Sequence, residues 1–369
     1  MSYQEIHASG LVIDSHCDTP LRLMDGCDIV RASKEGHFDL ERMRAGGVTS
    51  TFFAVYTSNA LSPDQATARA INMISRIYDF IAQNADQVAL GRYPKDLYEL
   101  RKEGKLGIFL GMENGAPIQK DLSLLRLFYK LGIRYLTLTH AGTNEICDSC
   151  TSKNPIWNGL SPFGIEVVKE MNRLGMLVDV SHISDAAFYD VLKHSKAPVV
   201  ATHSCCRSIC NIPRNMSDQM IKDLAAQNGV IQINFYPYFL DEKYRAVSTP
   251  LFEKFDEVET LWKQDKVKHA AIYQEAKEEL LACKAPSYKR VVDHIEHVIS
   301  LVGNAHVGLG SDFDGIETTP EGLSDISHMK VITKELLKRN FSERTIRNIL
   351  GGNFARAFSQ CMQVGYKQE

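Results

Sequence analysis

The sequence lacks any long hydrophobic run that would cross a membrane. No apolar stretch in its 369 residues is long enough to span a bilayer, and residues 1–5 lack the basic and apolar regions of a signal peptide. Residues 365–369 contain no hydrophobic tail that would direct lipid anchoring. We therefore expect a cytoplasmic protein that has no membrane partner.

A strong excess of charge of one sign is also missing. The formal net charge is -3, and no cluster of Lys and Arg suggests a nucleic-acid interface. Repeats at a solenoid period and low-complexity tracts are absent as well. With 44% hydrophobic and 24% charged residues, the composition is typical of a globular protein with a sizeable core. These features favour small-molecule chemistry.

The cysteines do not complete a structural zinc pattern. Cys147 and Cys150 form a CxxC pair, but no second such pair and no flanking pair of histidines accompanies them. Cys205, Cys206 and Cys210 form a second group. These thiols could form a zinc or redox site, but the favoured interpretation is that they have ordinary structural roles.

Eight short apolar runs alternate with longer stretches of helical periodicity, which is typical of repeated βα units. Eight is the number of strands that closes an α/β barrel, so we predict a (β/α)8 TIM-type barrel that forms one domain over residues 1–369. The predicted strands are Leu11–Ser15, Val48–Tyr56, Leu106–Met112, Ile133–Thr139, Met176–Ser181, Pro198–Thr202, Gly229–Phe235 and His306–Ser311.

Helices are predicted between and after these strands. Ser161 and Ser217 are expected to cap two of them, and Gly175 is expected to end the first. Residues 238–285, after the seventh strand, are a helical insertion that could serve as a lid, a subunit contact or a solvated excursion without a chemical role. The predicted helices are 64–84, 122–131, 163–174, 184–194, 217–227, 288–302, 329–338 and 342–360.

His, Asp and Glu recur where these strands end. His16 and Asp18 follow the first strand two residues apart, so both point the same way, while Cys17 points away from them. Glu113 follows the third strand, and His182 and His203 follow the fifth and sixth. Burying so many polar groups requires partners, and metal ions are natural ones.

Five such ligands suit two ions better than one. We assign His16 and Asp18 to one ion, His182 and His203 to the other, and Glu113 to both. Nitrogen and oxygen ligands favour Zn²⁺, with Mn²⁺ or Co²⁺ as substitutes. A water held by such ions is a nucleophile at neutral pH.

Three further residues suit supporting roles. His140, after the fourth strand, could stabilise an oxyanion, and Asp312, after the eighth, could shuttle a proton. Asp314 is the rival for the second role. Arg214, on the loop after the sixth strand, could clamp a carboxylate or could be an ordinary surface arginine.

Seven stretches from the first strand to the last helix carry a family resemblance: VIDSHCDTP, GMENG, YLTLTHAGTN, LVDVSHIS, PVVATHSCCRSICNIPRN, GLGSDFDG and GGNFARAF. Through them the chain resembles the renal or membrane dipeptidases, a branch of the amidohydrolase-type barrels. The resemblance implies a homodimer that hydrolyses dipeptides with free termini, often with a D-residue at the C-terminal side. It implies the two-zinc ligand set given above, with His140 and Arg214 as substrate-binding residues, Asp312 as the proton carrier and Tyr238 at a substrate contact.

Two other functions remain open from sequence. A deacetylase, deaminase or lactonase could use the same barrel and metals, and Arg214 would then have no substrate carboxylate to bind. A barrel without catalytic activity, retained for binding or as a scaffold, is disfavoured because all five proposed ligands are present.

Overall fold

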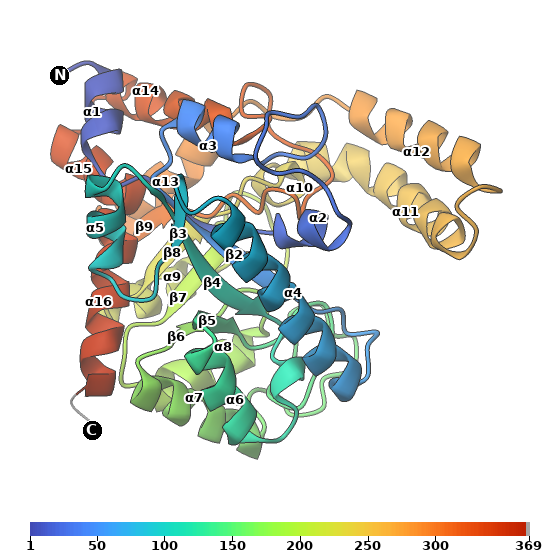
Figure 1. Ribbon diagram of the computed structural model, residues 1–369, viewed down its shortest axis with the longest axis horizontal. Helices are drawn as coiled ribbons and strands as arrows, with labels where there is room; N and C mark the ends of the chain where they lie inside the picture. The colour runs from blue at the N-terminus through green and yellow to red at the C-terminus, as the bar shows by residue number, and fades with distance from the viewer. Residues whose placement is uncertain (367–369) are drawn as a thin grey trace.

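Eight parallel strands form a sheet that curls into a nearly closed barrel (Figure 1). The computed structural model describes residues 1–366. The strands match the eight predicted runs in order, so the predicted (β/α)8 architecture is confirmed. Around the barrel they are β1 (Ile13–Cys17), β2 (Ser50–Tyr56), β4 (Leu106–Glu113), β5 (Ile133–Thr137), β6 (Leu177–Asp179), β7 (Val200–Ser204), β8 (Val230–Ile233) and β9 (Val307–Leu309).

Backbone hydrogen bonds join the end of the last strand to the first. The amide of Asp18 donates to the carbonyl of Phe313 at 2.8 Å, and the amide of Asp312 donates to the carbonyl of His16 at 3.0 Å. These bonds lie at the carboxyl ends of β1 and β9, where barrel enzymes carry their active sites. Barrel closure therefore brings two predicted site segments side by side.

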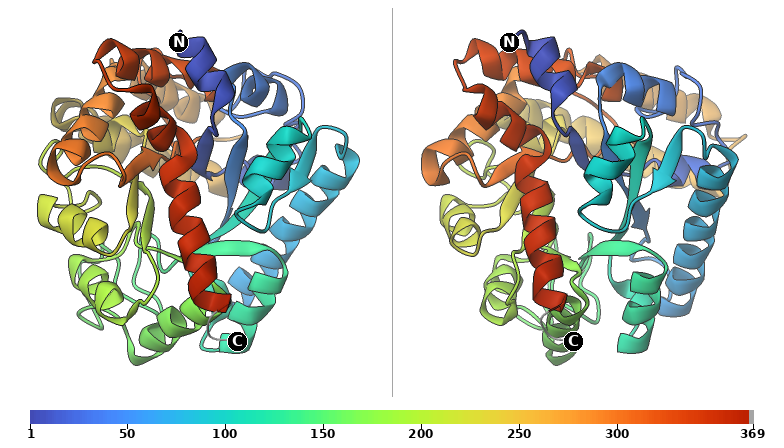
Figure 2. Two further views of the ribbon diagram at one scale, coloured as in Figure 1. Left: turned by 90° about the vertical axis from the view of Figure 1, so that its left-hand side faces the viewer. Right: turned by 60° about the vertical axis from the view of Figure 1, so that its left-hand side comes forward.

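Helices surround the barrel and cover one of its ends. Figure 2 shows α16 lying across the end that is opposite the carboxyl termini of the strands. The helices are α1 (Tyr3–Ser9), α2 (Pro20–Met24), α3 (Leu40–Gly46), α4 (Pro63–Gln83), α5 (Asp96–Lys102), α6 (Leu122–Lys130), α7 (Pro162–Leu174), α8 (Asp185–His194), α9 (Asp218–Ala226), α10 (Pro237–Leu240), α11 (Glu242–Gln264), α12 (Ala270–Ala282), α13 (Lys289–Val302), α14 (Lys330–Lys338), α15 (Glu343–Arg347) and α16 (Asn353–Tyr366).

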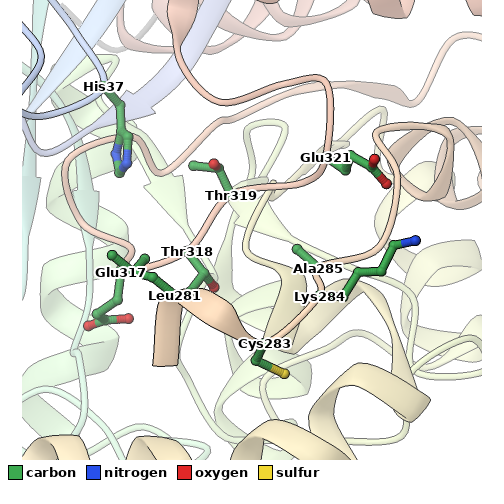
Figure 3. A pocket seen from close by; sticks show the side chains of 9 residues that line it. All are labelled: His37, Leu281, Cys283, Lys284, Ala285, Glu317, Thr318, Thr319 and Glu321. Carbon is green, nitrogen blue, oxygen red and sulfur yellow. The ribbon is translucent and has the colours of Figure 1, made fainter. Parts of the chain in front are cut away.

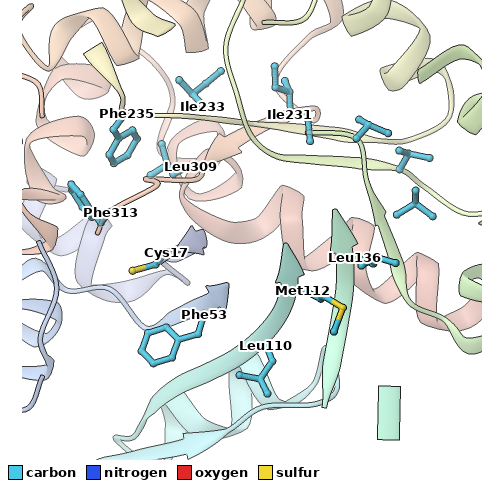
Figure 4. Close-up of a cluster of buried hydrophobic side chains, with 14 of the residues drawn as sticks. Cys17, Phe53, Leu110, Met112, Leu136, Ile231, Ile233, Phe235, Leu309 and Phe313 are labelled. Carbon is cyan, nitrogen blue, oxygen red and sulfur yellow. The ribbon is translucent and has the colours of Figure 1, made fainter. Parts of the chain in front are cut away.

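Aromatic rings fill the barrel interior beneath the rim. Phe52 stacks on Phe109 with ring centroids 4.9 Å apart and meets Phe354 of α16 edge-on at 5.0 Å. Tyr135 lies in the same buried cluster. A second and larger cluster fills the space between the strands and the outer helices, and part of it is shown in Figure 4. The rim is thus held by a packed core on both faces of the sheet.

The predicted helical insertion after the seventh barrel strand is confirmed. Helices α10, α11 and α12 occupy it, and α11 and α12 form a hairpin that projects from the barrel at the right of Figure 1. Tyr244, Phe252 and Leu280 give this hairpin a small hydrophobic cluster of its own. Among residues 1–366, no helix has the length and apolar character needed to cross a membrane.

Two predictions of secondary structure are corrected. Strand β3 (Val88–Leu90) was not predicted, and it pairs with β4 outside the barrel path. The single helix expected over 342–360 is divided into α15 and α16 by a π-helix, Asn348–Gly352. Here the backbone approaches the first strand so closely that a Cβ on Gly351 would lie 2.9 Å from Cγ1 of Ile13.

The predicted helix caps are confirmed. The Ser161 side chain accepts a hydrogen bond from the amide of Gly164, and α7 ends at Gly175, whose φ of 70° is left-handed. Ser217 accepts in the same way from the amide of Met220 at the start of α9. These caps satisfy backbone groups that a helix end leaves without partners.

Substituting Gly111 with alanine should destabilise the barrel. A Cβ at this position in β4 would overlap the ring of Tyr135, and a packed interior offers little room for the ring to move. We expect a loss of about 1–3 kcal/mol in the free energy of unfolding, measured by urea denaturation. The control is Gly10→Ala, whose Cβ would meet its nearest atom at 3.6 Å and which should cost less than about 0.5 kcal/mol. Equal stability of the two variants would contradict this account of the interior.

Candidate metal centre

The five predicted metal ligands converge at the carboxyl ends of the barrel strands, around the carboxylate of Glu113. Its Oε2 lies 3.5 Å from Nε2 of His16. Its other oxygen, Oε1, lies 3.1 Å from Nε2 of His182 and 3.3 Å from Nε2 of His203. Asp18 is on the side of His16, with Oδ2 3.3 Å from Nε2 of that histidine. The two oxygens of Glu113 therefore face two separate groups of side chains.

The cluster is buried and contains polar atoms without partners. Nε2 of His16 has no hydrogen-bond partner although the side chain is fully buried. Nε2 of His182 lies 2.8 Å from Nε2 of His203, so two imidazoles direct the same nitrogen toward each other and toward a carboxylate. Buried polar atoms in such an arrangement require a partner. Imidazole nitrogens and carboxylate oxygens within reach of one another are a donor set that fits divalent ions such as Zn²⁺.

Electrostatics prepares His182, His203 and Glu113 for metal binding. Burial, with the positive charge of Arg214 also acting, lowers the pKa of His182 and His203 well below the usual value for histidine. Burial alone would raise the pKa of Glu113, but the charge of His16 and the contacts with His182 and His203 hold it well below its usual value. Neutral imidazoles and an ionised carboxylate are the forms that bind metal ions.

A second layer of hydrogen bonds orients two of the imidazoles. Nδ1 of His16 lies 2.8 Å from the hydroxyl of Tyr135. Thr202 donates its hydroxyl proton to Asp179 at 2.7 Å, so its oxygen can only accept from Nδ1 of His203, which lies 2.8 Å away. That contact places the proton of His203 on Nδ1 and leaves Nε2 free for a metal.

Sequence reasoning missed this second layer. Tyr135, Thr202 and Asp179 belong to predicted strands, and no role at the site was predicted for them. One signal was available, because Tyr135 and Thr137 share one face of β5 by alternation and both are polar. Position in a strand does not reveal which hydroxyl contacts which ring.

His140 and Arg214 border the same cluster. Nε2 of His140 lies 4.0 Å from Oε1 of Glu113, and its ring packs 4.3 Å from the ring of His182. Arg214 is buried and donates to the hydroxyl of Ser204 at 2.8 Å and to the carbonyl of His203 at 2.6 Å. Its Nε has no partner. Among residues 1–366 no carboxylate forms an ion pair with Arg214, so its charge is available to an anionic ligand.

Asp312 reaches the cluster and its rival Asp314 does not. Oδ1 of Asp312 lies 3.8 Å from Nε2 of His16, and Oδ2 accepts a hydrogen bond of 2.8 Å from Asn234. Asp314 instead accepts from the hydroxyl of Thr19 at 2.7 Å and from the amide of His37 at 2.5 Å. Asp312, which was predicted to be the better placed of the two carboxylates, faces the candidate metal centre, and Asp314 does not.

Left-handed backbone places two of the site residues. His182 has a φ of 69° and Asp312 a φ of 64°. Such conformations are uncommon outside glycine and concentrate at functional sites. Gly315 makes room beside them, because a Cβ there would overlap Oδ2 of Asp18.

The remaining predicted residues lie outside the cluster. The hydroxyl of Tyr238 lies 3.0 Å from that of Thr249 within the insertion, and its ring meets Phe252 edge-on at 5.1 Å. Its substrate contact stays a prediction. All nine cysteines are free thiols. Within residues 1–366, no group of side chains that could hold a metal ion includes a cysteine.

Comparisons with known proteins agree with this geometry. The family model described as membrane dipeptidase, peptidase family M19, matches residues 1–369. Dipeptidase verJ of Clonostachys rogersoniana is 32% identical over 375 residues, covering 97% of this chain and 86% of that protein. Dipeptidase tcpJ of Claviceps purpurea is 31% identical, covering 90% of this chain and 71% of that protein.

A solved structure with the same fold also matches. The probable dipeptidase PvdM from Pseudomonas aeruginosa superposes with a TM-score of 0.86 at 26% identity, and 98% of each chain is covered. Together with the family match over the whole chain, this similarity extends from the first strand to the last helix. The chain therefore belongs to the membrane dipeptidase family, peptidase family M19, and is a metallopeptidase of the dipeptidase type.

Proposed function

We propose that this protein is a binuclear zinc dipeptidase that hydrolyses dipeptides with free termini, L,D-dipeptides among them. The observation that carries the proposal is the position of Glu113, whose two oxygens face His16 on one side and His182 and His203 on the other. A carboxylate that faces two sets of ligands is suited to bridge two ions.

The ligand assignment follows the geometry of the cluster. His16 and Asp18 would hold one Zn²⁺, His182 and His203 the other, and Glu113 both, with Mn²⁺ or Co²⁺ able to replace zinc. When bound, the two ions supply a water nucleophile at neutral pH and polarise the scissile carbonyl.

Arg214 would position the substrate by its terminal carboxylate. The guanidinium is buried beside the cluster, has no carboxylate partner among the described residues, and has a fork geometry that matches a carboxylate. Tyr238, at the base of the insertion, is proposed as a further substrate contact, reached from the rim through neighbouring aromatic rings.

His140 and Asp312 would act on the reacting bond. His140 lies beside Glu113, and a hydrogen bond from its ring would support the negative charge that develops on the carbonyl oxygen. Asp312 is held by Asn234 with its second oxygen toward the cluster, a position from which it can carry a proton to the departing amine.

Removing the hydroxyl of Tyr135 should weaken metal binding while leaving the barrel folded. Tyr135→Phe keeps the ring in the barrel interior but loses the contact to Nδ1 of His16. Loss of such an outer contact reduces metal affinity by about 10- to 100-fold, which competition with a zinc chelator would measure. Tyr78→Phe is the control, because that hydroxyl bonds the carbonyl of Leu131, away from the cluster. The same affinity in both variants would contradict the proposed orientation of His16.

Arg214 should matter only for substrates that carry a free carboxylate. We expect Arg214→Gln to lower kcat/KM for a dipeptide by roughly 10- to 100-fold, because a charged hydrogen-bonding partner is lost. The same substitution should have little effect on the C-terminally amidated dipeptide, which the wild-type enzyme should already cleave poorly.

The matched control is Arg207→Gln on the same loop, since Arg207 pairs with Asp185 at 2.6 Å instead of facing the cluster. Equal cleavage of free and amidated dipeptides by the wild-type enzyme would contradict the dipeptidase assignment. It would favour a deacetylase, deaminase or lactonase on the same barrel.

A further inference from the structure

Glu317 is an acidic residue at the barrel rim that has no basic partner. It lies on the loop after β9 with its side chain exposed, and it accepts one hydrogen bond of 2.6 Å, from the hydroxyl of Tyr236 to Oε2. No Lys, Arg or His among residues 1–366 forms an ion pair with it. The negative charges of Asp256 and Asp312 also act on its carboxylate. An arriving cation would relieve this accumulation of negative charge.

A short chain of contacts connects Glu317 to the candidate metal centre. The amide of Tyr236 donates to Oδ1 of Asn234 at 2.6 Å, and Nδ2 of Asn234 donates to Asp312 at 2.8 Å. Glu317 therefore extends the acidic side of the centre, the side that contains Asp18 and Asp312.

Two aromatic rings lie between Glu317 and Arg214. Its guanidinium lies 5.4 Å from the ring centre of Phe239, and that ring lies 4.9 Å from the ring of Tyr236. Two aromatic rings thus separate a buried positive charge from the acidic rim residue. A dipeptide whose carboxylate binds Arg214 would direct its N-terminal residue toward Asp312 and Glu317.

Lys284 lines the same cavity as Glu317 but forms no ion pair with it. The cavity has a volume of about 400 Å³ and is lined also by Leu281, Cys283 and Thr318. In Figure 3 the carboxylate of Glu317 points away from Lys284 and Glu321, which lie across the cavity, so Lys284 does not neutralise it.

We propose that Glu317, held by Tyr236, determines specificity by receiving the cationic side chain of a Lys or Arg at the N-terminal position of the dipeptide. This inference rests on the dipeptidase function proposed above. Tyr236 occupies Oε2 and leaves Oε1 for the ammonium or guanidinium donors.

The α-ammonium group of the substrate is a poorer partner for Glu317 than a cationic side chain. It is attached to the carbon next to the scissile carbonyl, so it must remain beside the metal centre, where Asp18 and Asp312 already lie. Glu317 is separated from that position by Asn234 and Tyr236. The long side chain of Lys or Arg reaches farther from that position than the α-ammonium does.

The test compares two dipeptides that differ in charge but have nearly the same length, Lys-Ala and norleucine-Ala. We expect the wild-type enzyme to prefer Lys-Ala by roughly 10-fold or more in kcat/KM. Glu317→Gln should abolish that preference, mainly through a higher KM for Lys-Ala, and leave norleucine-Ala within about twofold of wild type. Glu317→Lys should reverse the preference in favour of Glu-Ala.

Glu321→Gln is the matched control, because it removes the other glutamate of the same cavity and should leave the preference intact. An equal loss on both dipeptides in Glu317→Gln would instead indicate a role at the α-ammonium or in the fold and would overturn the assignment. So would a wild-type enzyme that cleaves both dipeptides without discrimination. A wild-type enzyme that cleaves neither would overturn the dipeptidase function itself, and this assignment with it.

Discussion

The burial of several carboxylates and imidazoles around one point is the constraint on which the site depends. Asp18, Glu113, His16 and His203 are almost completely removed from water, yet their charged or polar atoms face one another. The negative charges of Glu113 and Asp18 raise the pKa of His16 well above its usual value despite its burial. The electrostatic potential of the cluster therefore favours cations. Divalent ions neutralise more of its negative charge than a single proton does.

The barrel brings the residues of this cluster together and holds them in place. Residues far apart in the sequence end at one rim because parallel strands present their carboxyl ends together. Beneath the rim, Phe52, Phe109 and Tyr135 fill the interior, and Tyr135 also contacts His16, so the packing of the core and the orientation of a ligand depend on the same ring. Charges of both signs border the cluster, Arg214 and Asp312 among them, and the proposed substrate also carries charges of both signs.

Much of this arrangement could be predicted because strand alternation is a simple rule. It placed His16 and Asp18 on one face and Cys17 on the other, and Cys17 is indeed in the hydrophobic cluster outside the barrel. The rule applies only within strands. Beyond β9 the chain turns through left-handed conformations at Asp312 and Asp314, so their side chains diverge and alternation could not distinguish them. Strand β3 was missed because it lies off the barrel path, where the alternation of βα units requires no strand. Hydroxyl contacts such as Thr202 to His203 depend on tertiary packing that no local pattern encodes.

The central claim is that Glu113 bridges two metal ions. It is tested most directly by anomalous X-ray diffraction at the zinc absorption edge, on crystals of the zinc-loaded protein. The account predicts two anomalous peaks, one between Glu113 and the pair His16 and Asp18, and one between Glu113 and the pair His182 and His203. A single peak that Glu113 does not contact, or two peaks away from this carboxylate, would contradict it.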